Sequence, residues 1–285
     1  MANTINKQVI VPEVYSALVR EKVKGKVKVA QFLVNLGDLK GKVGETINFE
    51  KWGYIGDGKD WNPNTPMDVT QMKQTQTSAT IKAIQAPAVK VADYDDEVAL
   101  GNAIEEAAEQ QSISIGRKYD TDAIACALTS PLKYKLGAKN TVTQDEMIAI
   151  LGLYGDDRDS ADFDAILISS LFAPSFYKMD MFTSRERTMT TDGSGIAVNG
   201  VIGEFLGIPV VLSDRLYDAT NTEGFILVMK KNAISIIPKE SPFAEASRDA
   251  GLRQTTIYLS QFYAMALTDD TAVVVAKTVL PNQGK

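Results

Sequence analysis

The sequence contains no histidine among its 285 residues. This absence excludes Ser-His-Asp and Cys-His nucleophile systems, imidazole metal ligands and histidine-based pH switches. Many enzymes work without a catalytic histidine, so the absence lowers the expectation of an enzyme without excluding one. The chain also has a single cysteine, Cys126, which excludes an internal disulfide framework and suits a reducing compartment.

Long hydrophobic runs are missing as well. No stretch approaches the roughly 20 apolar residues that a membrane helix needs. The first seven residues lack the charged start and apolar centre of a signal peptide. Hydrophobic residues nevertheless make up 45% of the chain, enough for one large core or two modest ones. We therefore expect a soluble protein with no membrane partner.

Charge is distributed unevenly around a net value of −6. Residues 1–51 carry nine basic against five acidic side chains, whereas residues 93–164 carry six against sixteen. A basic arm and an acidic body can pair between copies of one chain. The alternative is a basic strand edge that resists aggregation. Nucleic-acid binding through so acidic a body is not expected.

Residues 38–91 are poor in side chains that could form a core. A strand-like run at 45–52 turns through glycines and returns as 71–80, which is polar on both faces apart from Met72 and Ala79. Strands need an apolar face to bury, and an isolated hairpin is marginal in water. The pattern predicts that a neighbouring copy of the chain supports this segment, which favours an assembly protein over a solitary enzyme.

Residues 1–36 have the pattern of an extended arm with a short helical segment around Leu18. Lysine alternates strictly with valine or glycine within residues 20–29, and this alternation predicts a strand with its lysines on one face. Large aromatics on a hairpin without a core favour a contact between subunits, the alternative being a local aromatic cluster. The candidate contact residues are Lys22, Lys24, Lys26, Lys28, Trp52, Tyr54 and Trp61.

The longest helical pattern follows this hairpin. Asp93 can cap it, apolar residues recur at three- and four-residue steps to about 129, and Pro131 follows. Such a helix would be about 50 Å long. Gly116 weakens it locally, so a break into two helices there is the alternative. Cys126 lies on the apolar stripe and is expected to be a small core residue.

The rest of the chain predicts an α+β fold. Thr143 and Glu146 form a capping box, residues 163–168 a buried strand, and Ser169 the cap of a short helix. A strand is expected after Gly207. Short strands are expected at 225–229 and 233–237. Long C-terminal strands at 255–267 and 272–280 are joined by a tight turn.

No motif assigns a chemistry. The aspartates between 156 and 164 lack the central glycine and final glutamate of a calcium-binding loop, so we expect a solvated acidic loop. Residues 56–60 carry glycines and a lysine but do not match a phosphate-binding loop. We expect no catalytic residue, metal or cofactor and no enzyme activity. A carboxylate-dependent hydrolase is a remote alternative, because spacing singles out no pair of acids.

The order of these parts resembles the major capsid proteins of tailed phages, whose fold is the Hong Kong 97 type. Four short stretches carry the resemblance: residues 51–57, 79–82, 207–211 and 257–264. Each stretch is weak alone, and their order over nearly the whole chain is what indicates the family.

The resemblance implies a division of the chain into four parts. Residues 1–36 would be the N-terminal arm, 37–92 the extended E-loop hairpin, 93–135 with 236–285 the peripheral domain, whose spine helix is 93–129, and 136–235 the axial domain. The arm begins near Met1, which implies a separate scaffolding protein or earlier cleavage.

The family also implies partners and a location. Copies would form pentamers and hexamers of an icosahedral shell around double-stranded DNA, without sequence-specific binding, together with a scaffolding protein and a portal. The location would be the virion capsid, preceded by the host cytoplasm. An encapsulin-like nanocompartment shell, which shares the fold, is the alternative.

Overall fold

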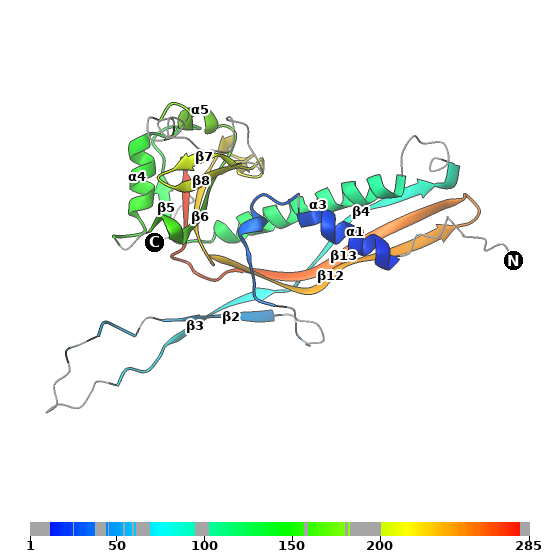
Figure 1. The fold of residues 1–285 in the computed structure, drawn as a ribbon, viewed down its shortest axis with the longest axis horizontal. Helices are drawn as coiled ribbons and strands as arrows, with labels where there is room; N and C mark the ends of the chain where they lie inside the picture. Colours follow the sequence, from blue (N-terminus) through cyan, green and yellow to red (C-terminus); the bar gives the residue numbers. More distant parts are fainter. Residues whose placement is uncertain are drawn as a thin grey trace.

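The computed structural model describes residues 12–24, 26–37, 44, 46–53, 55–58, 60, 69–94, 103–156, 159–179, 182 and 201–279. Figure 1 shows three parts: a long sheet accompanied by two helices, a second sheet with its own helices at one end, and a projecting hairpin. The mixture of helices and strands confirms the predicted α+β class.

Helix α3 (Ala103–Ala127) runs along the long sheet. It is continuous through Gly116, so the alternative of a break at this glycine is wrong. A Cβ atom at position 116 would lie 3.3 Å from the Lys26 Cβ and 3.4 Å from the Lys26 carbonyl carbon. The glycine therefore allows the backbone around Lys26 to approach the helix closely. The start of the predicted helix, at residues 95–102, lies outside the described residues.

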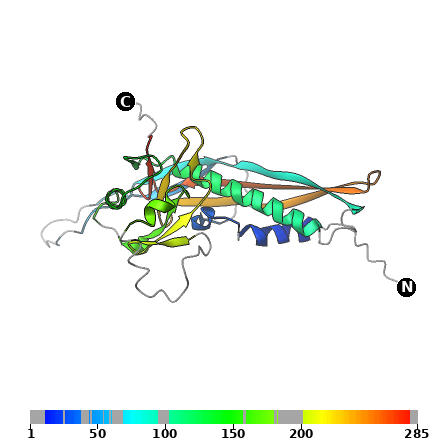
Figure 2. The same ribbon diagram turned by 90° about the horizontal axis from the view of Figure 1, so that it is seen from above.

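Helix α1 (Pro12–Lys24) packs beside α3, as Figures 1 and 2 both show. The prediction of a strand over residues 20–29 is therefore wrong for its first half. Tyr15, Val19 and Val23 recur every four residues and are all buried, which is a helical stripe. The alternation of lysine and valine was too short to distinguish a strand from this stripe. A single turn of 3₁₀ helix, η1 (Ala30–Phe32), follows.

The long sheet has four strands in the order β1 (Val34–Asn35), β12 (Ile234–Asp249), β13 (Gln254–Leu267) and β4 (Lys82–Ala92). The prediction of β13 is confirmed. β12 extends twelve residues beyond its expected end at Ile237. Register shifts between Pro238 and Phe243 interrupt its alternation, which hid the continuation from the sequence pattern.

The second sheet has six strands in the order β5 (Lys133–Lys135), β14 (Val273–Lys277), β11 (Ile226–Lys230), β6 (Phe163–Ile168), β8 (Ile208–Leu212) and β7 (Val201–Phe205). A small pair, β9 (Tyr217–Asp218) and β10 (Glu223–Gly224), lies beside it. The predicted strands at 163–168 and after Gly207 are confirmed.

Short helices accompany this sheet. α4 (Gln144–Gly152) begins with the predicted capping box, in which Thr143 and Glu146 exchange side-chain and backbone hydrogen bonds. α5 (Ala173–Phe176) begins after Phe172 without a side-chain cap, so the prediction that Ser169 caps it is wrong. The 3₁₀ turn η2 (Ser160–Asp162) is capped by Asp159.

The turn between β13 and β14 connects the two sheets. β13 pairs with β12 and β4, whereas β14 pairs with β11 and β5. The expected turn exists, with the Thr271 amide donating to Asp269 Oδ1 at 3.0 Å. Turn chemistry fixes only a local change of direction, so it could not reveal that the strands belong to different sheets.

Candidate assembly surfaces

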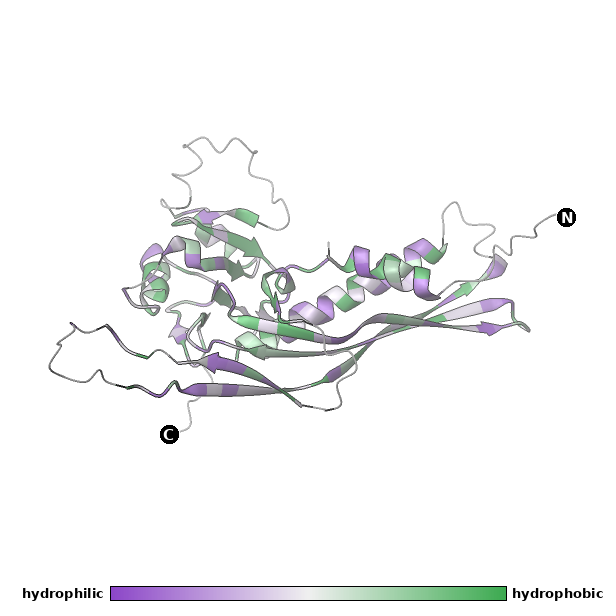
Figure 3. Ribbon diagram, turned by 60° about the horizontal axis from the view of Figure 1, so that its bottom comes forward, coloured by the Kyte–Doolittle hydropathy of each residue, from purple (hydrophilic) through white to green (hydrophobic). Residues whose placement is uncertain are grey.

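The hairpin predicted at 45–80 is present. β2 (Thr46–Trp52) and β3 (Gln74–Thr80) pair antiparallel from Thr46 opposite Thr80 to Trp52 opposite Gln74. These two strands form a sheet of their own. Figures 1 and 3 show the hairpin leaving the body below the long sheet.

The base of this hairpin rests on its own chain. Phe49 is only 2% exposed and packs with Ile237 and Ala266. The Lys51 ammonium lies 2.6 Å from Asp269 and 3.0 Å from Asp270. Burial acts to lower the pKa of Lys51, but the two carboxylates outweigh it and raise that pKa. The prediction that residues 38–91 have no support in their own chain is therefore wrong for the base and for β4, which belongs to the long sheet.

The distal limb of the hairpin is different. All described residues from 55 to 60 and from 69 to 78 are exposed. They include Ile55 at 58%, Val69 at 97% and Met72 at 57% exposure. The limb thus exposes apolar side chains and has no core among its described residues, and its support by a neighbouring copy stays a prediction.

Two of the candidate lysines have partners within the chain. The Glu109 carboxylate on α3 lies 3.2 Å from the Lys22 ammonium and 2.8 Å from that of Lys26. Lys26 and Lys22 lower the pKa of Glu109. Lys28 is half-buried after the helix. These contacts hold α1 against α3, and a role for these lysines in contacting another copy stays a prediction.

The remaining candidates lie outside what the structure describes. These are the side chains of Lys24 and Trp52, together with Tyr54 and Trp61. Their role as contacts between copies also stays a prediction.

Asp120 on α3 holds the segment that follows α1. The residue is 3% exposed, and its carboxylate accepts hydrogen bonds from the backbone amides of Lys28, Val29 and Ala30 at 2.8 to 3.2 Å. Burial raises the pKa of Asp120, and the three amides only partly offset this effect. Sequence reasoning missed this residue, because its partners lie about 90 positions away.

Gln111, also buried on α3, connects four elements. Its Oε1 accepts from the Tyr15 hydroxyl on α1 at 2.8 Å. Its Nε2 donates to the carbonyls of Pro87 on β4 at 2.9 Å and Ile257 on β13 at 3.2 Å. A buried amide with all its partners fixes one packing arrangement.

The carboxylate of Asp122 on α3 has three partners. It accepts from the Tyr263 hydroxyl at 2.5 Å and the Lys118 ammonium at 3.0 Å, and Lys82 lies 3.5 Å away. Burial acts to raise the pKa of Asp122, but Tyr263 and the lysines lower it. A carboxylate saturated in this way joins α3 to β4 and β13.

None of the helices that the described residues form is long and apolar enough to cross a membrane. The same residues contain no group of three or more Cys, Asp or Glu side chains that could hold a metal ion.

The chain is similar to capsid proteins along nearly its whole length. It is 28% identical over 274 residues to the major capsid protein of Staphylococcus phage phiMR11, covering 93% of this chain and 92% of the relative. No family model matches the sequence.

Solved structures of shell-forming proteins are similar to this chain as well. The capsid structure of cyanophage P-SCSP1u has a TM-score of 0.63 at 15% identity, covering 99% of this chain and 94% of that one. A virus-like particle from Pyrococcus furiosus has a TM-score of 0.59 at 10% identity, and the match covers 94% of this chain and 100% of that one. The fold is that of a phage capsid subunit. The resemblance to phage major capsid proteins is confirmed, and the function that these similarities support is that of a phage major capsid protein.

Proposed function

We propose that copies of this protein assemble, as pentamers and hexamers, into an icosahedral shell that encloses the double-stranded DNA of a tailed phage. The observation that carries the proposal is the exposed limb of the hairpin, in a chain similar throughout to a phage major capsid protein. Many modest contacts of this kind add up around a closed shell.

The Hong Kong 97-type division belongs to the same proposal. Residues 1–36 act as the arm, 37–92 as the E-loop, 93–135 with 236–285 as the peripheral domain and 136–235 as the axial domain. The long sheet and α3 support the peripheral domain, since residues 103–127 and 234–267 pack together. The six-stranded sheet supports the axial domain, although β14 also contributes to it.

The role is mechanical rather than catalytic, exercised in the virion capsid after synthesis in the host cytoplasm. A scaffolding protein and a portal are the further partners we propose. DNA would be enclosed without sequence-specific contacts. A nanocompartment shell remains the rival with the same fold, and the similarity to a phage major capsid protein argues against it.

The experiment is deletion of residues 53–68, replaced by a short glycine linker. Because the hairpin base rests on Phe49 and Lys51, which the deletion keeps, the subunit is expected to stay folded. Electron microscopy and sedimentation should show that it forms no shells under conditions in which the full chain does. Shells of normal size from the deleted protein would refute the proposed role of the limb.

A further inference from the structure

The hairpin meets its own body over a small apolar area. Phe49, Ile237 and Ala266 are buried in this contact, and Ile47 and Ala79 pack against it partly buried. Apolar packing is non-directional, so a contact of this size holds the base of the hairpin without selecting one direction for it. Ion pairs and hydrogen bonds are directional, and two charged clusters of the described residues lie where the two limbs of the hairpin join the body.

The first cluster joins β2 to the turn between β13 and β14. The Lys51 ammonium lies 2.6 Å from Asp269 and 3.0 Å from Asp270, so one cation bridges two neighbouring carboxylates. Burial acts to raise the pKa of Asp269, but the hydrogen bonds from Lys51 and Thr271 lower it. The Asp269 carboxylate therefore stays charged near neutral pH and attracts the ammonium.

The turn that receives Lys51 is itself held in place. The amides of Thr268 and Asp269 donate to the Ala233 carbonyl at 2.9 and 3.2 Å. The hydroxyl of Ser130, which follows α3, donates to the Val273 carbonyl at 2.5 Å. Because β13 belongs to the long sheet and β14 to the six-stranded sheet, this turn has a fixed position relative to both.

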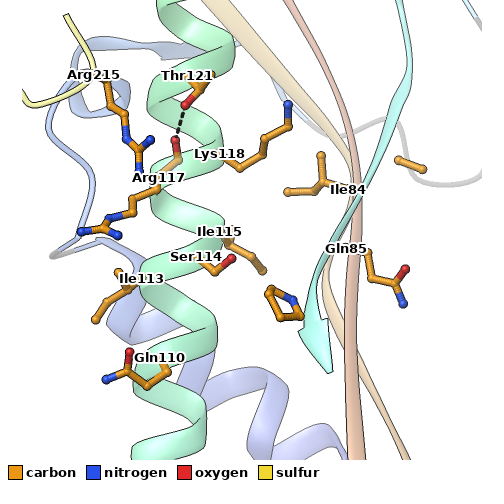
Figure 4. A pocket seen from close by; sticks show the side chains of 12 residues that line it. Ile84, Gln85, Gln110, Ile113, Ser114, Ile115, Arg117, Lys118, Thr121 and Arg215 are labelled. Atoms are coloured by element: carbon orange, nitrogen blue, oxygen red, sulfur yellow. Dashed lines mark hydrogen bonds between the residues drawn. The ribbon is translucent and has the colours of Figure 1, made fainter. Parts of the chain in front are cut away.

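The second cluster lies where β3 continues into β4. The Lys82 ammonium, at the start of β4, lies 3.5 Å from the Asp122 carboxylate on α3, and the Lys118 ammonium lies 3.0 Å from it. Figure 4 shows Lys118 on α3, where it lines a groove of about 720 Å³ together with Arg117 and Arg215. One limb of the hairpin is thus attached to α3 and the other to the turn.

We propose that the β13–β14 turn is a clamp that, through Lys51, fixes the direction in which the hairpin leaves the subunit. The β3 limb is fixed by its continuation into the long sheet, and Lys51 adds a second point of attachment on the β2 limb. Two points define a direction, whereas a single point allows a pivot. The inference rests on the proposed shell function in one respect, because a repeating shell needs the same direction in every copy.

The first test measures distances between spin labels on free subunits, in a Cys126→Ala background. Gln76→Cys on the hairpin is paired with Thr121→Cys on α3 and, separately, with Ala149→Cys on α4, all at exposed positions. Lys51→Met should raise the share of subunits outside the main distance peak about threefold in both pairs, because a partly exposed ion pair biases such an equilibrium modestly. Lys51→Arg should keep the original distribution.

Two controls separate the clamp from a general loosening of the subunit. The pair Thr121→Cys with Ala149→Cys reports on the body alone and should not change in Lys51→Met. Lys73→Met removes another exposed lysine of the hairpin and should leave the hairpin distances unchanged. An unchanged hairpin distribution in Lys51→Met, or an equally large change within the body, would overturn the clamp.

The second test asks whether Lys51 acts through the two carboxylates. Asp269→Asn with Asp270→Asn keeps the oxygen acceptor that Thr271 uses, and it should broaden the hairpin distances as Lys51→Met does. All three changes together should add nothing to either set, because they remove one shared interaction. Additive broadening would mean that Lys51 acts through other contacts, which would also overturn the proposal.

Assembly is measured separately. Lys51→Met should lower the yield of closed shells counted by electron microscopy, whereas Lys73→Met should not. A normal yield from Lys51→Met subunits with broadened distances would overturn the need for one direction and leave the proposed shell function intact. Because the distances are measured on free subunits, they test the clamp even if no shells form, so the two failures are distinguishable.

Discussion

At the scale of single residues, the molecule depends on buried polar side chains of α3. Asp120, Gln111 and Asp122 each join the helix to segments far away in sequence. A buried polar group is favourable only when its hydrogen bonds are made, so each partner geometry is strongly specified.

Asp120→Ala should lower the free energy of unfolding by about 3 kcal/mol, because it leaves buried amides of residues 28–30 without an acceptor. Asp120→Asn keeps one oxygen acceptor and should cost about 1 kcal/mol. Urea unfolding followed by circular dichroism measures both. Equal losses of unfolding free energy in the two variants would show that the hydrogen bonds from these amides do not contribute to stability.

The pH dependence of the same site has a definite sign. The pKa of Asp120 is raised in the folded state, so its contribution to stability is fully present below the ordinary aspartate pKa of about 3.9 and is lost as pH rises through the raised value. The stability of Asp120→Asn relative to the original protein should therefore improve from about pH 4 towards neutrality. Urea unfolding at several pH values measures it, with the exposed Asp60→Asn as control. A relative stability that falls with rising pH would contradict the assignment.

At the scale of elements, the hairpin has a supported base and an exposed limb. The base is fixed by Phe49 and Lys51, and the limb exposes Ile55, Val69 and Met72. The two parts should therefore respond differently to substitution.

Phe49→Ala should reduce the stability of the hairpin base by about 3 kcal/mol, because it empties the contact with Ile237 and Ala266. Hydrogen exchange should show faster exchange in β2 and β3 with unchanged protection of α3. Ile55→Ala is the matched control within the hairpin, expected to change stability by less than about 0.5 kcal/mol while reducing assembly. Uniform loss of protection in the Phe49 variant would mean that the hairpin and body unfold as one unit.

At the scale of the whole molecule, the proposed shell requires each copy both to give a limb and to receive one. The protein lacking residues 53–68 can receive a limb but cannot give one. Added at a small fraction to the full chain, it should therefore lower the yield of closed shells by more than its own share. Electron microscopy counts complete particles, and folded bovine albumin at the same concentration is the control. If the yield of closed shells fell only in proportion to the fraction of deleted protein, the deleted copies would not be incorporated into shells.

Local patterns predicted much of this fold. The hairpin pairing, the capping box of α4, strands β6 and β13 and the continuous core of α3 followed from periodicity and turn chemistry, which act over a few residues. The errors have a common cause. The last part of α1, from Arg20, was interpreted as a strand because its apolar stripe is short, and β12 was predicted to end before its bulges.

The sequence by itself determined the polar, core-poor limb and the order of elements, because composition and spacing are fixed along the chain. Tertiary structure alone decided that β13 and β14 enter different sheets, that Lys22 and Lys26 meet Glu109, and that Arg117 and Arg215 share a groove. These contacts join residues tens to hundreds of positions apart. Their energy depends on burial and geometry, which no local pattern contains.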